Sequence, residues 1–223
     1  MNKSLKALEE KIGHHFGDKD LLHTALTHSS TGHETNYERL EFLGDRVLGL
    51  VVAQLLYEKF PEENEGDLAK RLASLVQGSM LAQMATQIEL GDYIHFSEAE
   101  RSAGGNENDN ILADVFESLI GALYLESGLR APEKLIHELW SDVLDTMIAP
   151  PQHPKTGLQE WAQGQSLPLP VYEIVSQSGP DHAPVFDIKL EVRGFDPIVA
   201  QGRTRQEAEK EVAREFLKKI KKD

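Results

Sequence analysis

Two stretches of this sequence combine a strongly apolar helical pattern with acidic residues on a single side, and this combination constrains the fold most. At about 100° per residue, the acids of each stretch fall on one stripe of a helix. The rest of each stripe and the opposite face are apolar or glycine, which is typical of a buried helix. The acids are Glu38, Glu41 and Asp45 in residues 38–56 and Asp114 and Glu117 in residues 111–125.

The acidic stripes predict a metal site. Ionised carboxylates on buried helices cost free energy unless a cation compensates them, and no lysine lies in the core of either helix. The chain has no cysteine, and its 9 histidines show no spacing typical of zinc ligands. Oxygen ligands favour a hard cation, so we expect Mg²⁺, with Mn²⁺ able to substitute.

Charge is distributed unevenly along the chain. Residues 1–153 contain 26 acidic and 12 basic residues, whereas residues 154–223 contain 11 of each, so the whole net charge of −14 belongs to the first part. The net negative charge of the whole chain, taken as one number, argues against nucleic-acid binding. By region, the charge instead indicates that a polyanion must be held by local basic patches and approaches the acidic part with metal present.

The first part of the chain has helical periodicity throughout, which predicts an all-α domain over residues 1–148. We expect Asp67 to be an N-cap and Gly128 to end a helix. A proline-rich linker is expected at 149–154, because prolines 150, 151 and 154 cannot continue a helix. The predicted helices are 3–13, 18–28, 36–59, 67–88, 92–100, 106–126 and 131–147.

The pattern of apolar and polar residues changes in 155–223. It predicts a small α+β domain there, with the element order α-β-β-β-α. Apolar and polar residues alternate in three short runs, as in half-buried strands, and the last helix begins at a capping box, Thr204 to Glu207. The predicted elements are a helix at 155–164, strands at 171–177, 184–193 and 197–201, and a final helix.

No apolar run reaches the length that crosses a membrane, and the N-terminus lacks the apolar segment of a signal peptide. With no cysteine to form disulfides, these features lead us to expect a cytoplasmic protein without a membrane partner.

Four motifs in this order resemble the ribonuclease III family: ALTHSS (25–30), ERLEFLGDRVL (38–48), FP…EGDLAKRLASLV (60–76) and ILADVFESLIGALYL (111–125). The C-terminal part resembles a double-stranded-RNA-binding domain through KTGLQEWAQ, GPDHAPVF and TRQEAEKEVA, at the three contact regions of such domains. The resemblance covers essentially the whole chain and is closest to the bacterial form, with one endonuclease domain and one RNA-binding domain.

This resemblance implies a Mg²⁺-dependent endoribonuclease that cleaves double-stranded RNA as a homodimer, without a small-molecule cofactor. The products would carry 5′-phosphate and 3′-hydroxyl ends, and the substrates would be ribosomal RNA precursors and structured messenger RNAs. The implied metal ligands are Glu41, Asp45, Asp114 and Glu117, and the implied catalytic residues are Asp45, Glu117, Glu38 and Glu65. The implied RNA-binding residues are Thr156, Gln159, Glu160, His182, Ala183, Arg203, Arg205 and Lys210.

Some positions have simpler interpretations. The acids could be paired with Arg39, Arg46 or Lys70, although we expect Arg46 to project to another face. Glu38 could serve only the helix dipole, Glu65 could be one of several loop acids, and we expect His28 to be structural. Gln206 and Glu209 stand where the family often has bases, which predicts a weaker hold on phosphate.

Two further expectations concern packing. Gly49 and Gly121 lie on the acidic stripes and are expected to let the two helices approach closely. Phe42, Leu43 and Val47 would offer an apolar surface for the dimer.

Two other functions remain as alternatives. A non-catalytic double-stranded-RNA-binding relative would usually have lost the carboxylate set, which is complete here. A metal-dependent DNA nuclease is opposed by the C-terminal domain, whose layout recognises A-form shape.

Overall fold

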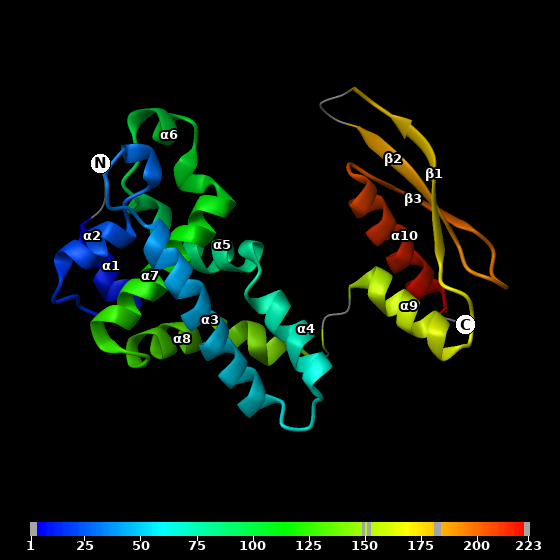
Figure 1. Ribbon diagram of the computed structural model, residues 1–223, viewed down its shortest axis with the longest axis horizontal. Coiled ribbons are helices and arrows are strands. Elements are labelled where there is room, and N and C mark those ends of the chain that lie inside the picture. The colour runs from blue at the N-terminus through cyan, green and yellow to red at the C-terminus, as the bar shows by residue number, and fades with distance from the viewer. Residues whose placement is uncertain (1–3, 149, 151–152, 181–183, 221–223) are drawn as a thin grey trace. The chain divides into compact units, whose positions relative to one another are not determined.

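The computed structural model of this chain describes residues 4–148, 150, 153–180 and 184–220. It divides into two compact units, Met1–Pro150 and Pro151–Asp223 (Figure 1). Pro154 belongs to the first turn of a helix rather than to the segment between the units, because its ring suits a helix start.

The first unit is helical, as predicted, and the only β-type pairing among its described residues is a single bridge between Thr27 and His95. Short 3₁₀ turns occupy Ser29–Thr31 (η1), Leu90–Asp92 (η2) and Gly105–Glu107 (η3). The α-helices are α1 (Leu5–Ile12), α2 (Lys19–Ala25), α3 (Glu38–Lys59), α4 (Glu65–Leu75), α5 (Gly78–Gln87), α6 (Glu98–Ser102), α7 (Asp109–Ser127) and α8 (Arg130–Thr146).

Helices α3 and α7 form the centre of this unit, with α2, α5 and α8 packed around them (Figure 1). Their apolar faces supply a large share of the core, in which Leu48, Val52, Phe116 and Leu119 are completely buried. The apolar pattern on nearly all sides predicted that both helices are buried. This is confirmed for the core faces but wrong for one side of α3, where Phe42, Leu50 and Tyr57 are exposed.

Two glycines allow α3 and α7 to touch backbone to backbone. A Cβ atom on Gly44 would lie 1.7 Å from the carbonyl oxygen of Glu117, and one on Gly121 would lie 2.3 Å from that of Leu40. The expectation for Gly121 is therefore confirmed. The expectation for Gly49 is wrong: a Cβ there would have nothing within 4 Å, since the helices cross one turn earlier.

The predicted helix 67–88 is in fact two helices, α4 and α5. The chain turns at Val76 and Gln77, and the carbonyl of Leu75 accepts a hydrogen bond from Nε1 of the buried Trp140, at 3.2 Å. This tertiary hydrogen bond takes the place of one within a helix. The sequence did not reveal the break, because the periodicity is helical on both sides of the turn.

Two smaller expectations in this unit are also wrong. Asn64, not Asp67, caps α4: its Oδ1 accepts from the Asp67 N–H at 3.1 Å. The predicted helix 92–100 is replaced by the short helix α6 at 98–102, because His95 instead pairs with the backbone of Leu26 and His28. Gly128 does end α7, with φ +67°.

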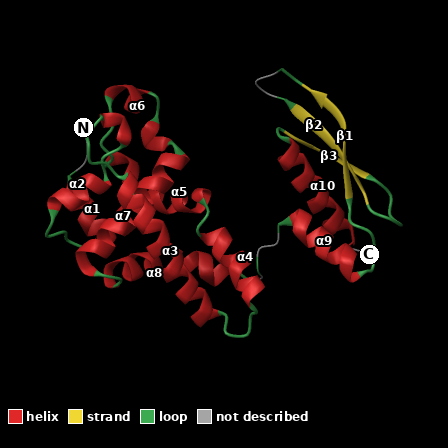
Figure 2. Cartoon of the chain, in the orientation of Figure 1, coloured by secondary structure: helices red, strands yellow, loops and turns green. Residues whose placement is uncertain are grey.

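The second unit has the predicted α-β-β-β-α order. Three antiparallel strands lie in the order β1-β2-β3 (Figure 2), and α10 packs against β2, β3 and α9. Leu158, Ile188, Val212 and Phe216 form much of its core. Its elements are α9 (Pro154–Gly164), β1 (Val171–Ser178), β2 (Val185–Glu191), β3 (Ile198–Gly202) and α10 (Arg205–Ile220).

Helix α10 starts at the predicted cap, with one difference. Thr204 Oγ1 accepts from the Glu207 N–H at 3.1 Å, as in a capping box. The Glu207 carboxylate accepts from the N–H of Arg203, at 2.8 Å, rather than from that of Thr204.

Across the described residues, none of the helices is both long enough and apolar enough to traverse a bilayer.

Candidate metal centre and nucleic-acid interface

Three of the predicted metal ligands converge where α3 and α7 cross. Glu41 on α3 and Asp114 and Glu117 on α7 each offer a carboxylate oxygen, and these oxygens all lie within 4.8 Å of one another. The glycine contact places the two backbones so close that short acidic side chains from both helices can meet. We call Glu41, Asp114 and Glu117 the carboxylate cluster.

Each helix supplies its acids for a local reason. In α7, Asp114 and Glu117 are three residues apart and share one face, and the helix start is fixed by Asn108, whose Oδ1 accepts from the N–H groups of Asn110 and Ile111. In α3, Glu41 lies one turn before Gly44, next to the helix crossing. The cluster is therefore carried by rigid helices rather than by loops.

Within the described part of the chain, the carboxylate cluster has no cationic partner. No lysine, arginine or histidine among these residues forms an ion pair with Glu41, Asp114 or Glu117. Lys70, one of the suggested partners, pairs instead with Asp67 at 3.2 Å. All three side chains are half-buried, which leaves each able to offer an oxygen to a bound ion.

The electrostatics reflect this lack of compensation. Burial, followed by the charges of Asp45, Glu41 and Asp114, raises the pKa of Glu117 to about 8. Burial and the neighbouring acids also raise the pKa of Glu41, and burial raises that of Asp114 despite the nearby His28. Like charges at close range in a partly dry site are stabilised by a proton or by a metal ion.

The donor set fits a hard divalent cation. Carboxylate oxygens alone form the cluster, with no sulfur or imidazole ligand, and Mg²⁺ and Mn²⁺ prefer such oxygens. One or two carboxylates usually hold Mg²⁺ together with water or substrate oxygens, so three converging side chains are sufficient.

Asp45 lies close to the cluster but outside it. Its Oδ2 is 3.0 Å from Nη1 of Arg46, and both side chains are partly exposed. The expectation that Arg46 projects away from the acids is therefore wrong, since its long side chain bends back toward its neighbour. Arg46 also counteracts the rise in the pKa of Glu117.

Glu38 and Glu65 occupy very different places. Glu38 starts α3, accepts from Asn36 Nδ2 at 3.2 Å, and is close enough to raise the pKa of Glu41. Glu65 starts α4, beyond the other end of α3 (Figure 1). Helical residues rise about 1.5 Å each, so Glu41 is about 27 Å from Lys59 at that end. Within one chain, Glu65 does not reach the cluster.

His28 and Tyr37 form a layer beside the cluster. The rings are stacked with centroids 5.5 Å apart, and His28 Nδ1 accepts from the Ser30 N–H at 3.2 Å. Burial and the charge of Asp114 raise the pKa of Tyr37 to about 12. His28 thus makes the kind of hydrogen bond expected of a structural histidine. Sequence reasoning missed Tyr37, although it lies one turn before Glu41.

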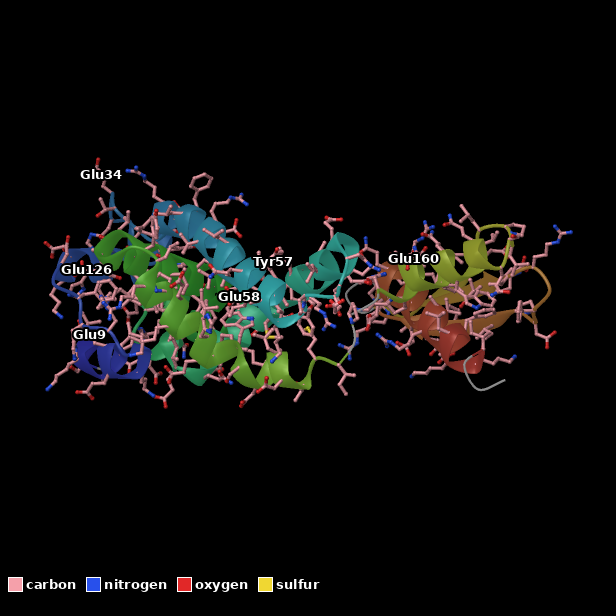
Figure 3. The ribbon with its side chains drawn as sticks, turned by 90° about the horizontal axis from the view of Figure 1, so that it is seen from below. Glu9, Glu34, Tyr57, Glu58, Glu126 and Glu160 are labelled. Carbon is pink, nitrogen blue, oxygen red and sulfur yellow. The ribbon has the colours of Figure 1, made fainter. Side chains whose placement is uncertain are left out.

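In the second unit, the predicted contact residues of the first and third regions are on the surface. Thr156, Gln159 and Glu160 are exposed on α9, where Figure 3 labels Glu160. His182 and Ala183 lie outside the described residues. Exposed basic side chains gather around the start of α10, at Arg203, Arg205 and Lys210.

Comparisons with known proteins agree with both halves of this description. Residues 18–143 match the family model described as Ribonuclease-III-like, and residues 154–220 match the double-stranded RNA binding motif. Ribonuclease 3 of Caulobacter vibrioides is 47% identical over 217 residues, covering 95% of this chain and 94% of that protein. Ribonuclease 3 of Ehrlichia canis is 43% identical over 221 residues, covering 97% and 98%.

A solved structure resembles the first unit. The crystal structure of the nuclease domain of ribonuclease III from Campylobacter jejuni has a TM-score of 0.61 and 43% sequence identity, covering 63% of this chain and 96% of that one. A second structure of the same domain concerns flexibility in a region involved in dimer formation.

The two family models together, and each of these two relatives, cover most of the chain. The chain therefore belongs to the ribonuclease III family and is an endoribonuclease of double-stranded RNA.

Proposed function

We propose that this enzyme cleaves duplex RNA with Mg²⁺ held by Glu41, Asp114 and Glu117, with Asp45 as a further ligand. The single observation that carries the proposal is the uncompensated carboxylate cluster at the α3–α7 crossing. Mn²⁺ would substitute, because it has the same preference for oxygen ligands.

The residues would act as follows. Glu41, Asp114 and Glu117 hold the ion from two rigid helices, so its position relative to the RNA is set by the helix crossing. Glu117 carries a proton near neutral pH in the free protein and gives it up to become a ligand. When bound, a divalent ion would supply a more acidic water and positive charge to offset the charge that develops during hydrolysis of the phosphodiester. Glu38 supports the cluster from the start of α3.

The proposed products carry 5′-phosphate and 3′-hydroxyl ends. The proposed substrates are duplex regions of ribosomal RNA precursors and of structured messenger RNAs. In the second unit, we propose that Thr156, Gln159 and Glu160 face a minor groove, that His182 and Ala183 reach a second one, and that Arg203, Arg205 and Lys210 contact the intervening phosphates. Glu65 would contact RNA rather than the metal of its own chain.

We propose a homodimer formed through the exposed side of α3. Phe42 is 71% exposed beside a groove of about 1050 Å³, lined by Leu43, Leu125 and other residues. Tyr57, labelled in Figure 3, extends the exposed apolar side of the same helix at 74% exposure. Val47, expected to contribute, is buried in the core and cannot. A region of the Campylobacter jejuni nuclease domain is involved in dimer formation.

The proposal is tested with the purified protein on three labelled substrates: long duplex RNA, single-stranded RNA and duplex DNA. Each is incubated with Mg²⁺, with Ca²⁺ and with chelator. We expect cleavage of duplex RNA with Mg²⁺ only, with 5′-phosphate ends. Ca²⁺, which is larger and more loosely coordinated, should support binding with little cleavage. Equal cleavage of duplex RNA in chelator would contradict the metal proposal.

A further inference from the structure

A buried glutamate joins the starts of the two helices of the second unit. Glu209, on the second turn of α10, is only 6% exposed. Its carboxylate accepts from Lys155 Nζ at 2.5 Å and from Arg205 Nε at 2.8 Å. Lys155 lies in the first turn of α9 and Arg205 is the first residue of α10, so one acidic side chain holds a cation from each helix.

A third element restricts the lysine further. Lys155 Nζ lies 4.7 Å from the ring centroid of Tyr172 on β1, a distance at which the cation is attracted to the aromatic face. Burial, followed by the charge of Glu209, raises the pKa of Tyr172 to about 12, so this ring stays neutral. Lys155 is therefore confined between a carboxylate and an aromatic ring.

Both cations still face solvent. The side chain of Lys155 is 31% exposed and that of Arg205 is 61% exposed. Arg205 uses only Nε toward Glu209, and among the described residues its two terminal nitrogens make no hydrogen bond or ion pair with protein. A guanidinium has five N–H donors, so the outer edge remains available for a phosphate.

The charge of Glu209 is stable. Burial by itself would raise the pKa of this carboxyl, but the hydrogen bonds and charges of Lys155 and Arg205 outweigh burial and lower it below its ordinary value. The site is thus a satisfied ionic group, unlike the carboxylate cluster of the nuclease unit.

We propose that Glu209 is a positioning residue that holds Lys155 and Arg205 as one preorganised phosphate-binding pair. The inference rests on the proposed binding of duplex RNA by the second unit. Lysine and arginine side chains lose more rotamer entropy than most when they are ordered. If Glu209 orders them before RNA arrives, binding no longer has to supply that free energy.

This proposal reverses the expectation drawn from charge alone. An acid among bases that contact a polyanion should weaken binding, and its removal should then strengthen binding. A positioning role predicts the opposite sign, because the two cations become mobile when the carboxylate is removed. The direction of the change in affinity therefore distinguishes the two interpretations.

The test measures duplex RNA binding by the full chain carrying Glu117→Gln, which prevents cleavage, in Mg²⁺ and over a range of salt concentrations. Adding Glu209→Gln should raise the Kd about three- to tenfold. It should also make the slope of log Kd against log salt shallower, by up to about 0.9 for each phosphate that is no longer neutralised. The matched control is Glu215→Gln, which removes an exposed charge from the same helix and should leave binding equal or tighter.

A second set of variants, which lacks both cations, distinguishes a positioning role of Glu209 from a merely structural one. With Lys155→Gln and Arg205→Gln already present, Glu209→Gln should change the Kd by less than twofold, since nothing remains to be positioned. Melting curves establish that each variant is folded. Where Glu209→Gln is not, Glu209→Met takes its place, because an apolar side chain of similar volume is often tolerated at a buried ionic site.

The outcomes are distinct. Binding by Glu209→Gln that equals or exceeds that of its parent overturns the positioning role, as does an equal loss in the background that lacks both cations. If the parent itself does not bind duplex RNA, the proposed function fails instead.

Discussion

Glu117 and Glu209 are two partly or fully buried glutamates on helices. Burial by itself would raise the pKa of both, yet their pKa values shift in opposite directions. The pKa of Glu117 rises to about 8, whereas that of Glu209 falls below its ordinary value. The difference lies in their neighbours: three acids surround Glu117, and two cations contact Glu209. A buried carboxylate that is paired is part of the fold, whereas one among other acids is prepared for a ligand.

The same contrast accounts for the uneven charge of the chain. The part that contains the carboxylate cluster is acidic, whereas the part proposed to hold RNA has no net charge. In the nuclease unit, we propose that repulsion among the acids favours the binding of a metal ion, at a cost in stability that the apolar packing of α3 and α7 offsets. In the second unit, acids such as Glu209 are matched with bases, so the remaining basic edges can contact phosphate.

The largest effect is expected from Glu117→Gln. This change keeps the shape of the side chain but removes a charge that should hold the metal, so cleavage of duplex RNA at ordinary Mg²⁺ should fall by roughly 10³-fold or more. Binding and folding should survive. Single-turnover assays measure the loss of cleavage, and melting curves measure whether the variant remains folded. Near wild-type turnover would show that the carboxylate cluster is not the active site.

Separating the two units should give the next largest effect. A fragment ending at Ala149 keeps the carboxylate cluster and loses every proposed contact in the second unit. It should still cut duplex RNA at low salt and high Mg²⁺, but at physiological salt its affinity should fall by about 10² or more, because several phosphate contacts are missing. Titrations of cleavage rate against RNA concentration separate weak binding from slow chemistry.

One outcome for this fragment would contradict the separation of chemistry and binding between the two units. A fragment that is folded and dimeric but inactive at saturating RNA would mean that the second unit takes part in the chemistry. The complementary piece, 154–223, should bind duplex RNA in preference to duplex DNA and cleave neither.

The pH dependence of stability offers a smaller but direct test. The pKa of Glu117 is about 8 in the folded protein and near its ordinary value of 4.5 when unfolded, so between these values the folded state retains a proton that the unfolded state has lost. Through this group, metal-free protein should therefore lose stability as the pH rises from 4.5 to 8, and be restored by Mg²⁺. Thermal melts in chelator measure this trend.

Glu117→Gln provides the comparison for that experiment. The variant should melt close to wild type at pH 5 and several degrees higher at pH 9, where wild type carries the extra negative charge. Glu215→Gln, at an exposed position, should show no such divergence. If Glu117→Gln is less stable than wild type at pH 9, the glutamate is structurally paired and the contrast with Glu209 disappears.

The smallest effect concerns Arg46, whose charge opposes the rise in the pKa of Glu117. Its pair with Asp45 is partly exposed, and such pairs contribute about 0.2–1 kcal/mol. Arg46→Gln should lower the melting temperature of metal-free protein slightly and tighten Mn²⁺ binding about two- to threefold, because Arg46 competes with metal for Asp45. Calorimetric titration measures this, with Lys6→Gln, at an exposed position of the same unit, as the control. A large loss of stability would mean that the acids are already compensated.

Much of the architecture could be predicted from local patterns. Period and composition determined the helical unit, the proline-rich boundary, the three strands and the faces on which the acids lie. The resemblance to ribonuclease III added their roles, and the comparisons confirmed the family. These features depend on neighbours within a few residues along the chain, which a single sequence contains in full.

Other features depend on where distant segments meet. Periodicity assigned Gly49, Asp45 and Glu41 to one stripe of α3, but the crossing point with α7 selects Gly44 for the close contact and leaves Asp45 with Arg46. Similarly, the hydrogen bond from Trp140 to Leu75 divides a stretch that was helical by pattern.

Glu209 shows the same limit most clearly. From the sequence it was an acid at a position often basic in the family, and so a weakness in RNA binding. Only the packing of α9 against α10 brings Lys155, 54 positions away, to its carboxylate. The sequence by itself determined which residues carry charge and which faces they occupy. The tertiary structure decided whether each buried charge meets a partner, because burial and pairing depend on atoms contributed by distant parts of the chain.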